Sequence, residues 1–262
     1  MALLDDHRLL VTGVLTDDSL AFAIARRALE EGATVALSSF GRGMSLTRRT
    51  ARKLAEVGDV GEVIELDVTD PDQVRGAAAE LEGRFGRLDG LVHAIGYAPP
   101  SCLGSGMFAA PFEDVATALH ASTYSLAALV GALRPLLARS SAPGGASVVA
   151  LDFDGSRAYP QYDWMGVAKA ALESLGRYLA REVGPDRVRV NMLAAGPLRS
   201  IAAKSIPGFS LFEDTWADRA PLGWDVNDTS VVGDAALALL SPLLRATTGA
   251  ILHVDGGAHA VG

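Results

Sequence analysis

The chain has 262 residues, of which 49% are hydrophobic, enough to bury a sizeable core in one large α/β domain or two small ones. Its formal net charge of −8 repels nucleic acid and anionic membrane surfaces, so we expect neither as a partner. The single cysteine, Cys102, excludes an internal disulfide and a cysteine-built metal site, and we expect no metal.

The beginning of the chain and the length of its apolar runs indicate a soluble protein. The start, MALLDDHRLLVTG, lacks the charged leader, apolar run and cleavage site of a secretion signal and is typical of a first strand. No apolar run reaches the roughly 18 residues that are needed to span a bilayer. We therefore expect a cytoplasmic protein.

Short apolar runs alternate with longer amphipathic segments along the chain. The predicted strands are Arg8–Gly13, Thr34–Ser39, Glu62–Val68, Leu88–Gly96, Ala146–Phe153, Arg187–Leu193 and Ala250–Gly257. The predicted helices between them are Ser19–Glu31, Ser45–Val57, Pro71–Phe85, Phe112–Arg139, Asp163–Val183 and Asp228–Leu240. Most strands are apolar on both faces, as in a parallel sheet that helices cover. The alternation predicts right-handed βαβ units and an α/β fold of the Rossmann type, with a doubly wound parallel sheet.

One late region departs from this alternation. Residues Leu198–Asp228 contain Pro207, Gly208 and Pro221, and we expect short helices that cover the ligand crevice as a lid. No Pro/Ser-rich linker or internal repeat divides the rest of the chain. We therefore predict a single dinucleotide-binding catalytic domain over residues 1–262, with the lid at about 198–228 as its substrate-binding part.

The end of the first strand has features of a nucleotide site. Gly13 ends the strand, and Ser19 is predicted to cap a helix whose free N–H groups favour a pyrophosphate. The usual glycine-rich fingerprint is absent, so any capped strand–turn–helix also explains this segment.

Later strand ends strengthen the nucleotide interpretation. Phe40 could stack on an adenine, and Asp67 could accept a bond from the adenine amino group. Alternatively, Phe40 packs on the next helix and Asp67 is a cap that precedes one. The small residues Ala94–Gly96 let the backbone approach a ribose. Because Arg42 could pair with a 2′-phosphate, NADH and NADPH both stay open.

The segment YDWMGVAK carries the candidate chemistry. Tyr162 and Lys169 are seven positions apart, close to two helical turns, so they are expected to share a face of a helix that Asp163 can cap. A lysine there can reach a cofactor ribose and favour a negatively polarised oxygen near the phenol. The alternative is a loop tyrosine and a solvated lysine.

In these residues the chain resembles the enoyl-acyl-carrier-protein reductases, a divergent branch of the short-chain dehydrogenase/reductases. The matching motifs are Gly13, Ser19 and Ala21 in G-x5-S-x-A, Tyr162, Met165 and Lys169 in Y-x2-M-x3-K, and AAGPLRS at Ala194–Ser200. Ordinary short-chain reductases carry Tyr-x3-Lys and NNAG instead. The motifs DFD, YDWM and APLGW are more similar to the mycobacterial NADH-dependent type than to the general bacterial type.

The resemblance implies that NADH delivers hydride to the β-carbon of a trans-2-enoyl thioester of acyl carrier protein or coenzyme A, in type II fatty acid synthesis. It implies that Tyr162 bonds the thioester carbonyl, Lys169 holds the nicotinamide ribose and Phe153 orients the stacked rings. The implied cofactor-binding residues are Gly13, Val14, Ser19, Leu20, Phe40, Asp67, Val68, Ala94, Ile95, Gly96, Lys169, Gly196, Pro197 and Leu198. The implied substrate-binding residues are Tyr162, Met165, Ile206 and Phe209.

The sequence leaves alternatives open for the oligomeric state, the length of the acyl substrate and the function. The long helices Phe112–Arg139 and Asp163–Val183 could pack across a two-fold axis, so we expect a homotetramer, although ordinary burial within one chain explains them too. The lid is shorter than in the mycobacterial type, which predicts ordinary rather than very long acyl chains. A reductase of another enoyl or carbonyl substrate in secondary metabolism, and a non-catalytic nucleotide-binding protein, also stay open.

Overall fold

The structure, a computed structural model, describes residues 2–104, 106–204 and 206–261. Within them, seven parallel strands form one sheet in the order β3-β2-β1-β4-β5-β6-β7. The strands are β1 (Arg8–Thr12), β2 (Thr34–Ser39), β3 (Ile64–Glu65), β4 (Gly90–His93), β5 (Ser147–Asp152), β6 (Arg189–Ala195) and β7 (Ile251–Val254). The predicted doubly wound α/β fold is confirmed. Strand order reverses between β1 and β4, which is where open α/β sheets bind ligands.

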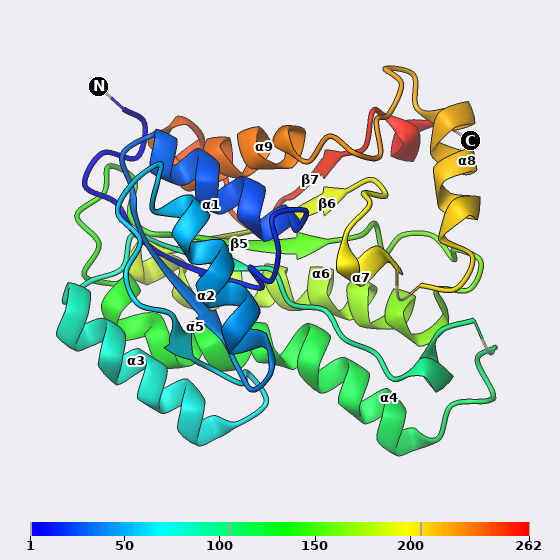
Figure 1. Ribbon diagram of the computed structural model, residues 1–262, viewed down its shortest axis with the longest axis horizontal. Helices are drawn as coiled ribbons and strands as arrows, with labels where there is room; N and C mark the ends of the chain where they lie inside the picture. Colours follow the sequence, from blue (N-terminus) through cyan, green and yellow to red (C-terminus); the bar gives the residue numbers. More distant parts are fainter. Residues whose placement is uncertain (1, 105, 205, 262) are drawn as a thin grey trace.

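Helices cover both faces of the sheet (Figure 1). One face carries α1 (Leu20–Glu30), α2 (Gly43–Leu54) and α9 (Ser230–Leu240). The other carries α3 (Pro71–Phe85), α5 (Ser125–Leu137) and α6 (Asp163–Val183), and α4 (Phe112–Leu119) packs against α6. The predicted short helices of the 198–228 region are α7 (Ile201–Lys204) and α8 (Phe209–Arg219), which lie on the side toward which the β5 arrow points in Figure 1.

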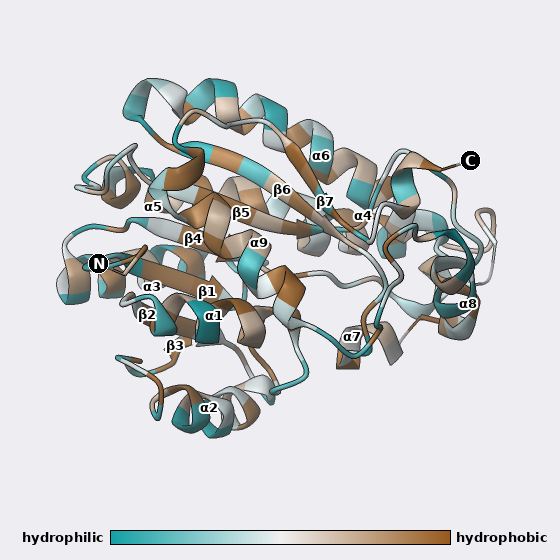
Figure 2. Ribbon diagram, turned by 90° about the horizontal axis from the view of Figure 1, so that it is seen from above, coloured by the Kyte–Doolittle hydropathy of each residue, from teal (hydrophilic) through white to brown (hydrophobic). Residues whose placement is uncertain are grey.

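Both faces of the central strands are buried, which explains their uninterrupted apolar runs. Leu9 and Val11 of β1 pack in the core that contains α1 and α9, while Leu10 packs in the core that contains α3, α5 and α6. Successive side chains of a strand point to opposite faces, so each layer of helices needs its own apolar set. Figure 2 shows the central strands as a largely hydrophobic layer between helices with polar outer surfaces.

Predicted boundaries differ most at the carboxyl edge of the sheet. The third strand is only β3, shorter than the predicted Glu62–Val68, because the Asp67 carboxylate closes a turn by accepting bonds from the backbone N–H and hydroxyl of Thr69 at 2.9 and 2.7 Å. The fourth ends at His93 because Ala94–Gly96 leave the sheet to line a cavity. The sixth starts two residues late, after Arg187 adopts a left-handed φ of 60°.

The predicted helix Phe112–Arg139 is α4 and α5 joined by the π-helical turn His120–Tyr124. By length and composition alone this joined helix, Phe112–Leu137, could cross a membrane, although it contains no uninterrupted apolar run of about 18 residues. Half of its most apolar window is buried inside the fold. Leu126 and Leu129 on α5 lie in the core against the sheet, which gives its apolar composition an ordinary structural cause.

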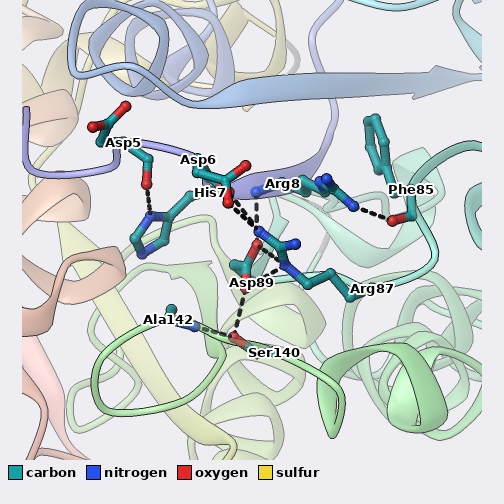
Figure 3. A network of polar contacts seen from close by, with 9 residues as sticks. All are labelled: Asp5, Asp6, His7, Arg8, Phe85, Arg87, Asp89, Ser140 and Ala142. Atoms are coloured by element: carbon teal, nitrogen blue, oxygen red, sulfur yellow. Dashed lines mark hydrogen bonds and ion pairs between the residues drawn. The ribbon is translucent and has the colours of Figure 1, made fainter.

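A buried carboxylate holds together the amino-terminal edge of the sheet (Figure 3). Asp89 is 1% exposed and accepts bonds from the backbone N–H of Arg8 at 3.0 Å, Nε of Arg87 at 3.2 Å and the hydroxyl of Ser140 at 2.6 Å. These donors come from β1, from the turn before β4 and from the residues after α5. Because the carboxylate is buried and accepts three bonds, loss of it leaves these part-buried donors without their shared acceptor.

We predict that Asp89→Ala lowers the free energy of unfolding by about 2–4 kcal/mol, because Arg87 and Ser140 lose their buried acceptor. Thermal unfolding followed by circular dichroism measures this. Asp6→Asn is the matched control, since the Asp6 carboxylate also bonds Arg87, at 2.8 Å, but its side chain is 76% exposed. Exposed ion pairs contribute little to stability, so equal losses in the two variants would contradict the role of burial.

Candidate active site

A cavity of about 750 Å³ lies at the carboxyl edge of the sheet. Its walls come from the segments that follow β1, β2, β4, β5 and β6, and from α8. The predicted site residues that line it are Gly13, Ser19, Leu20, Phe40, Val68, Ala94, Ile95, Gly96, Phe153, Tyr162, Met165, Lys169, Gly196, Pro197, Leu198, Ile206 and Phe209. The fold thus brings most of the predicted nucleotide and chemical residues into one space.

The nucleotide half is shaped by a close approach of two strand ends. Gly13 has a φ of 80°, and a Cβ at this position would lie 2.0 Å from the carbonyl oxygen of Ala94. Only glycine fits this conformation and this space. Ser19 caps α1 as predicted, since its Oγ accepts the N–H of Phe22 at 3.2 Å. The amino terminus of α1 therefore lies beside the backbone of Gly13, where no side chain fills the space. A dinucleotide pyrophosphate fits such a place, because the free N–H groups of the helix favour an anion.

Two predicted cofactor residues lie outside the cavity lining. Val14 is fully buried in the core, and its carbonyl accepts the hydroxyl of Thr47 at 2.7 Å. The Asp67 carboxylate is used in the turn with Thr69, which is close to the alternative role as a cap. Phe40 is at the rim and 52% exposed, where an adenine could contact its ring.

The chemical half places two titratable side chains in the same wall. Tyr162 and Lys169 are both buried, so the alternative of a solvated lysine does not hold. The ammonium of Lys169 donates to the carbonyl oxygen of Leu151 at 2.9 Å. Burial lowers the pKa of Lys169, and the nearby Asp152 carboxyl opposes this. Burial raises the pKa of the Tyr162 phenol, and Asp152 raises it further.

Tyr162 lies in a strained turn immediately before α6. Its neighbours Gln161 and Asp163 have φ values of 62° and 39°, which cost about 1–3 kcal/mol each in residues other than glycine. Contacts with the β4–α4 loop hold the turn, since Gly104 N–H donates to the Gln161 carbonyl at 3.0 Å and Gly106 N–H to Asp163 Oδ2 at 3.1 Å. The prediction that Asp163 caps α6 is therefore wrong: Tyr162 occupies the cap position, without a capping bond.

An aromatic cluster next to Tyr162 was missed by the sequence predictions. The ring of Phe153 lies 4.8–5.6 Å, between ring centroids, from those of Tyr159, Tyr162, Phe212 and Trp216. Phe212 and Trp216 come from α8, where Phe209, Phe212 and Trp216 follow the i, i+3, i+7 pattern of one helix face. That pattern was the available signal, and it joins the 198–228 region to the catalytic turn.

Comparison of the sequence with known proteins shows which protein family this chain is similar to. The sequence model of the family described as "Enoyl-(Acyl carrier protein) reductase" matches residues 13–259. Proteins named "Enoyl-[acyl-carrier-protein] reductase [NADH]" from Mycolicibacterium smegmatis and Mycobacterium avium are 42% and 43% identical, each over 98% of this chain and 97% of the relative. A protein from Aquifex aeolicus with the same name and the symbol FabI is 36% identical over 100% of this chain and 94% of its own.

We predict that Gly13→Ala lowers the free energy of unfolding by about 1–3 kcal/mol and weakens dinucleotide binding, because the new methyl group collides with the Ala94 carbonyl. Denaturant unfolding and isothermal titration measure the two effects. Gly83→Ala is the control, since a Cβ at this exposed position in α3 meets nothing within 4 Å. Helix propensity predicts that this control is neutral or slightly stabilising. Normal binding in Gly13→Ala would show that the close approach is dispensable.

Proposed function

The chain belongs to the enoyl-(acyl carrier protein) reductase family, and from this premise we propose that it is the NADH-dependent enoyl-acyl-carrier-protein reductase of type II fatty acid synthesis. It reduces the double bond of a trans-2-enoyl thioester: a hydride from NADH adds to the β-carbon and a proton from solvent adds to the α-carbon, which gives the saturated acyl thioester and NAD⁺. The observation that carries the proposal is the burial of Tyr162 and Lys169 in one wall of a cavity whose other half fits a dinucleotide.

The chain holds NADH with the residues that follow its strands. The amino terminus of α1 and Gly13 would receive the pyrophosphate, and Phe40, which lines the cavity, would contact the adenine. Lys169 bonds the hydroxyls of the nicotinamide ribose. When bound, NADH supplies the hydride that reaches the β-carbon of the substrate.

Tyr162 stabilises the charge that develops on the thioester oxygen. Because burial and Asp152 raise the pKa of its phenol, Tyr162 stays protonated at neutral pH and acts as a hydrogen-bond donor. A neutral donor bonds an enolate oxygen more strongly than the ground-state carbonyl, which lowers the barrier. Phe153 packs edge-on against Tyr162 and excludes water from the reacting atoms.

The acyl chain lies against the apolar wall that Met165, Ile206 and Phe209 contribute to the cavity. Residues 198–228, with α7 and α8, act as the lid of this single catalytic domain. Ordinary fatty-acyl chains are the substrates that this short lid favours.

The thioester carrier is acyl carrier protein or coenzyme A. Arg199 at the lid is paired with Glu213, with 2.6 Å between Nε and Oε1, so it offers little free positive charge to an acidic carrier protein. The proposed assembly is a homotetramer. Phe112 on α4, Tyr124 in the π-turn and Tyr178 on α6 leave large aromatic rings exposed on the helices expected to form the interface. A cytoplasmic location and the absence of nucleic acid and membrane partners stay predictions from the sequence.

We predict that NADH is oxidised with crotonyl-coenzyme A at least about tenfold faster than with acetoacetyl-coenzyme A. The last residues of β5 and the one that follows, Leu151, Asp152 and Phe153, offer no serine hydroxyl to assist carbonyl reduction. A spectrophotometric assay of both thioesters, with NADH and NADPH side by side, measures this. Faster turnover of acetoacetyl-coenzyme A would favour the alternative, a carbonyl reductase.

We predict that Tyr162→Phe lowers kcat about 10²–10³-fold while the Kd of NADH is unchanged, because the variant lacks the donor to the enolate oxygen. Steady-state kinetics and fluorescence titration measure the two quantities. Tyr159→Phe is the matched control on the same turn, since the Tyr159 hydroxyl bonds Asp154 at 3.3 Å rather than a substrate. Tyr162→Phe with full turnover would refute the assigned role.

A further inference from the structure

Asp152, the last residue of β5, is an unusual buried acid. Its side chain is 6% exposed, and both carboxyl oxygens are covered by protein atoms. By distance and angle, neither oxygen has a hydrogen-bond partner among the residues that the structure describes, although the Phe153 N–H and the Glu173 carboxyl lie near enough to affect the pKa of Asp152. Buried polar groups are ordinarily bonded, so this exception needs a physical cause. Asp152 is one of the residues that line the cavity, but because its carboxyl oxygens are covered, the carboxyl acts on a bound molecule through its neighbours.

The neighbours of Asp152 on α6 are two charged side chains one helical turn apart. Lys169 is the positive one, and its ammonium donates to the Leu151 carbonyl at 2.9 Å, beside Asp152 in the chain. Glu173 is the negative one, and its Oε1 accepts the N–H of Gly155 at 2.6 Å. Both have a backbone partner, and of the two it is the ammonium of Lys169 that favours the ionised form of Asp152, whereas Glu173 opposes it.

The remaining titratable groups around the cluster are neutral. His93 of β4 is buried, its Nε2 lies 2.8 Å from the Ser125 hydroxyl, and burial together with Lys169 lowers its pKa to about 3. Tyr162 keeps its proton because burial raises the pKa of its phenol. On β6, the residue paired with Asp152 is Ala194, which carries no charge. Burial, reinforced by Glu173 and opposed by Lys169, raises the pKa of Asp152 to about 7.

We infer that Asp152 is a positioning residue that acts through Lys169, as the buried counter-charge that keeps this ammonium protonated and available to the cofactor as the pH rises. The inference rests on the proposed function for the identity of the cofactor. Desolvation favours the neutral amine of Lys169, and a negative charge nearby opposes this. Without that charge, Lys169 loses its proton at a lower pH, and the cofactor loses a charged donor.

The test is the Kd of NADH for wild type and Asp152→Asn, measured by fluorescence titration between pH 6 and pH 9. At about pH 6 most of the wild-type carboxyl is protonated and resembles the amide, so the two proteins should bind NADH within about twofold of each other. At about pH 9 the carboxylate is ionised only in wild type. The variant should then bind NADH several-fold more weakly, because Lys169 without this negative charge loses its proton at a lower pH.

Asp154→Asn is the matched control. Asp154 is another buried acid two residues further on, and its Oδ1 accepts the Ser156 N–H at 3.0 Å. Burial raises its pKa, but the bonds to Ser156, the charge of His253 and the bond from Tyr159 together lower it below its usual value. It is therefore ionised across the whole pH range. Any effect of Asp154→Asn on the Kd should be the same at both ends of that range.

Melting temperatures recorded at each pH identify variants that do not fold. Should Asp152→Asn be one of them, Asp152→Glu keeps the charge and should retain the wild-type affinity near pH 9. The inference is overturned if Asp152→Asn binds like wild type at pH 9, or if its loss of affinity is equal at both pH values. A loss of affinity at pH 9 in Asp152→Glu overturns it too. Wild type that binds no NADH at any pH would instead refute the proposed function, and the inference with it.

Discussion

The buried ammonium of Lys169 is the constraint on which the rest of the site depends. A charge inside a protein persists only with bonded partners or an opposite charge, and Lys169 has the Leu151 carbonyl at 2.9 Å and the Asp152 carboxyl nearby. Both partners belong to the end of β5, so the same interaction fixes the position of α6 on the sheet. This accounts for an acidic residue at the end of a strand that is otherwise mostly apolar. The packing of α6 on the sheet and the charge of the site therefore depend on the same requirement, which is that the end of β5 compensates the buried ammonium of Lys169.

Tyr162 is held by a different means, because it precedes α6 and no hydrogen bond from the described part of the chain fixes its ring. The strained φ values of Gln161 and Asp163 set the direction of the turn, and packing on Phe153 sets the ring. Phe153 also packs on Phe212 and Trp216 of α8, so the proposed lid and the catalytic turn belong to one aromatic cluster. Movement of α8 would then be transmitted to the phenol by direct contact.

The sequence predicted those parts of the structure that local signals determine. The bounds of α3 follow from the Asp70 cap and the left-handed Gly86 at its end, and both signals are local. The rule that ligands bind at strand ends predicted most of the cavity lining. Other features depend on contacts between distant segments, which the spacing of residues along the sequence does not encode. These are the early end of β3, the direction of Val14 and the burial of Trp216. Asp152 could have been noticed as the acid in ALDFD, but its burial between β5 and α6 is a tertiary property.

The spacing of seven between Tyr162 and Lys169 has an electrostatic consequence that the periodicity of a helix does not show. The charge of Lys169 acts on Asp152 and His93, whereas the groups that shift the pKa of Tyr162 are its own burial, Asp152 and Tyr159. A lysine close to a phenol lowers its pKa and favours a base, which suits oxidation of an alcohol. Here the phenol is left as a neutral donor, which suits an oxygen that becomes negative as hydride reaches the β-carbon. The longer spacing thus separates the role proposed for Lys169, cofactor binding, from the role proposed for Tyr162, charge stabilisation, and this separation favours reduction of a carbon–carbon double bond.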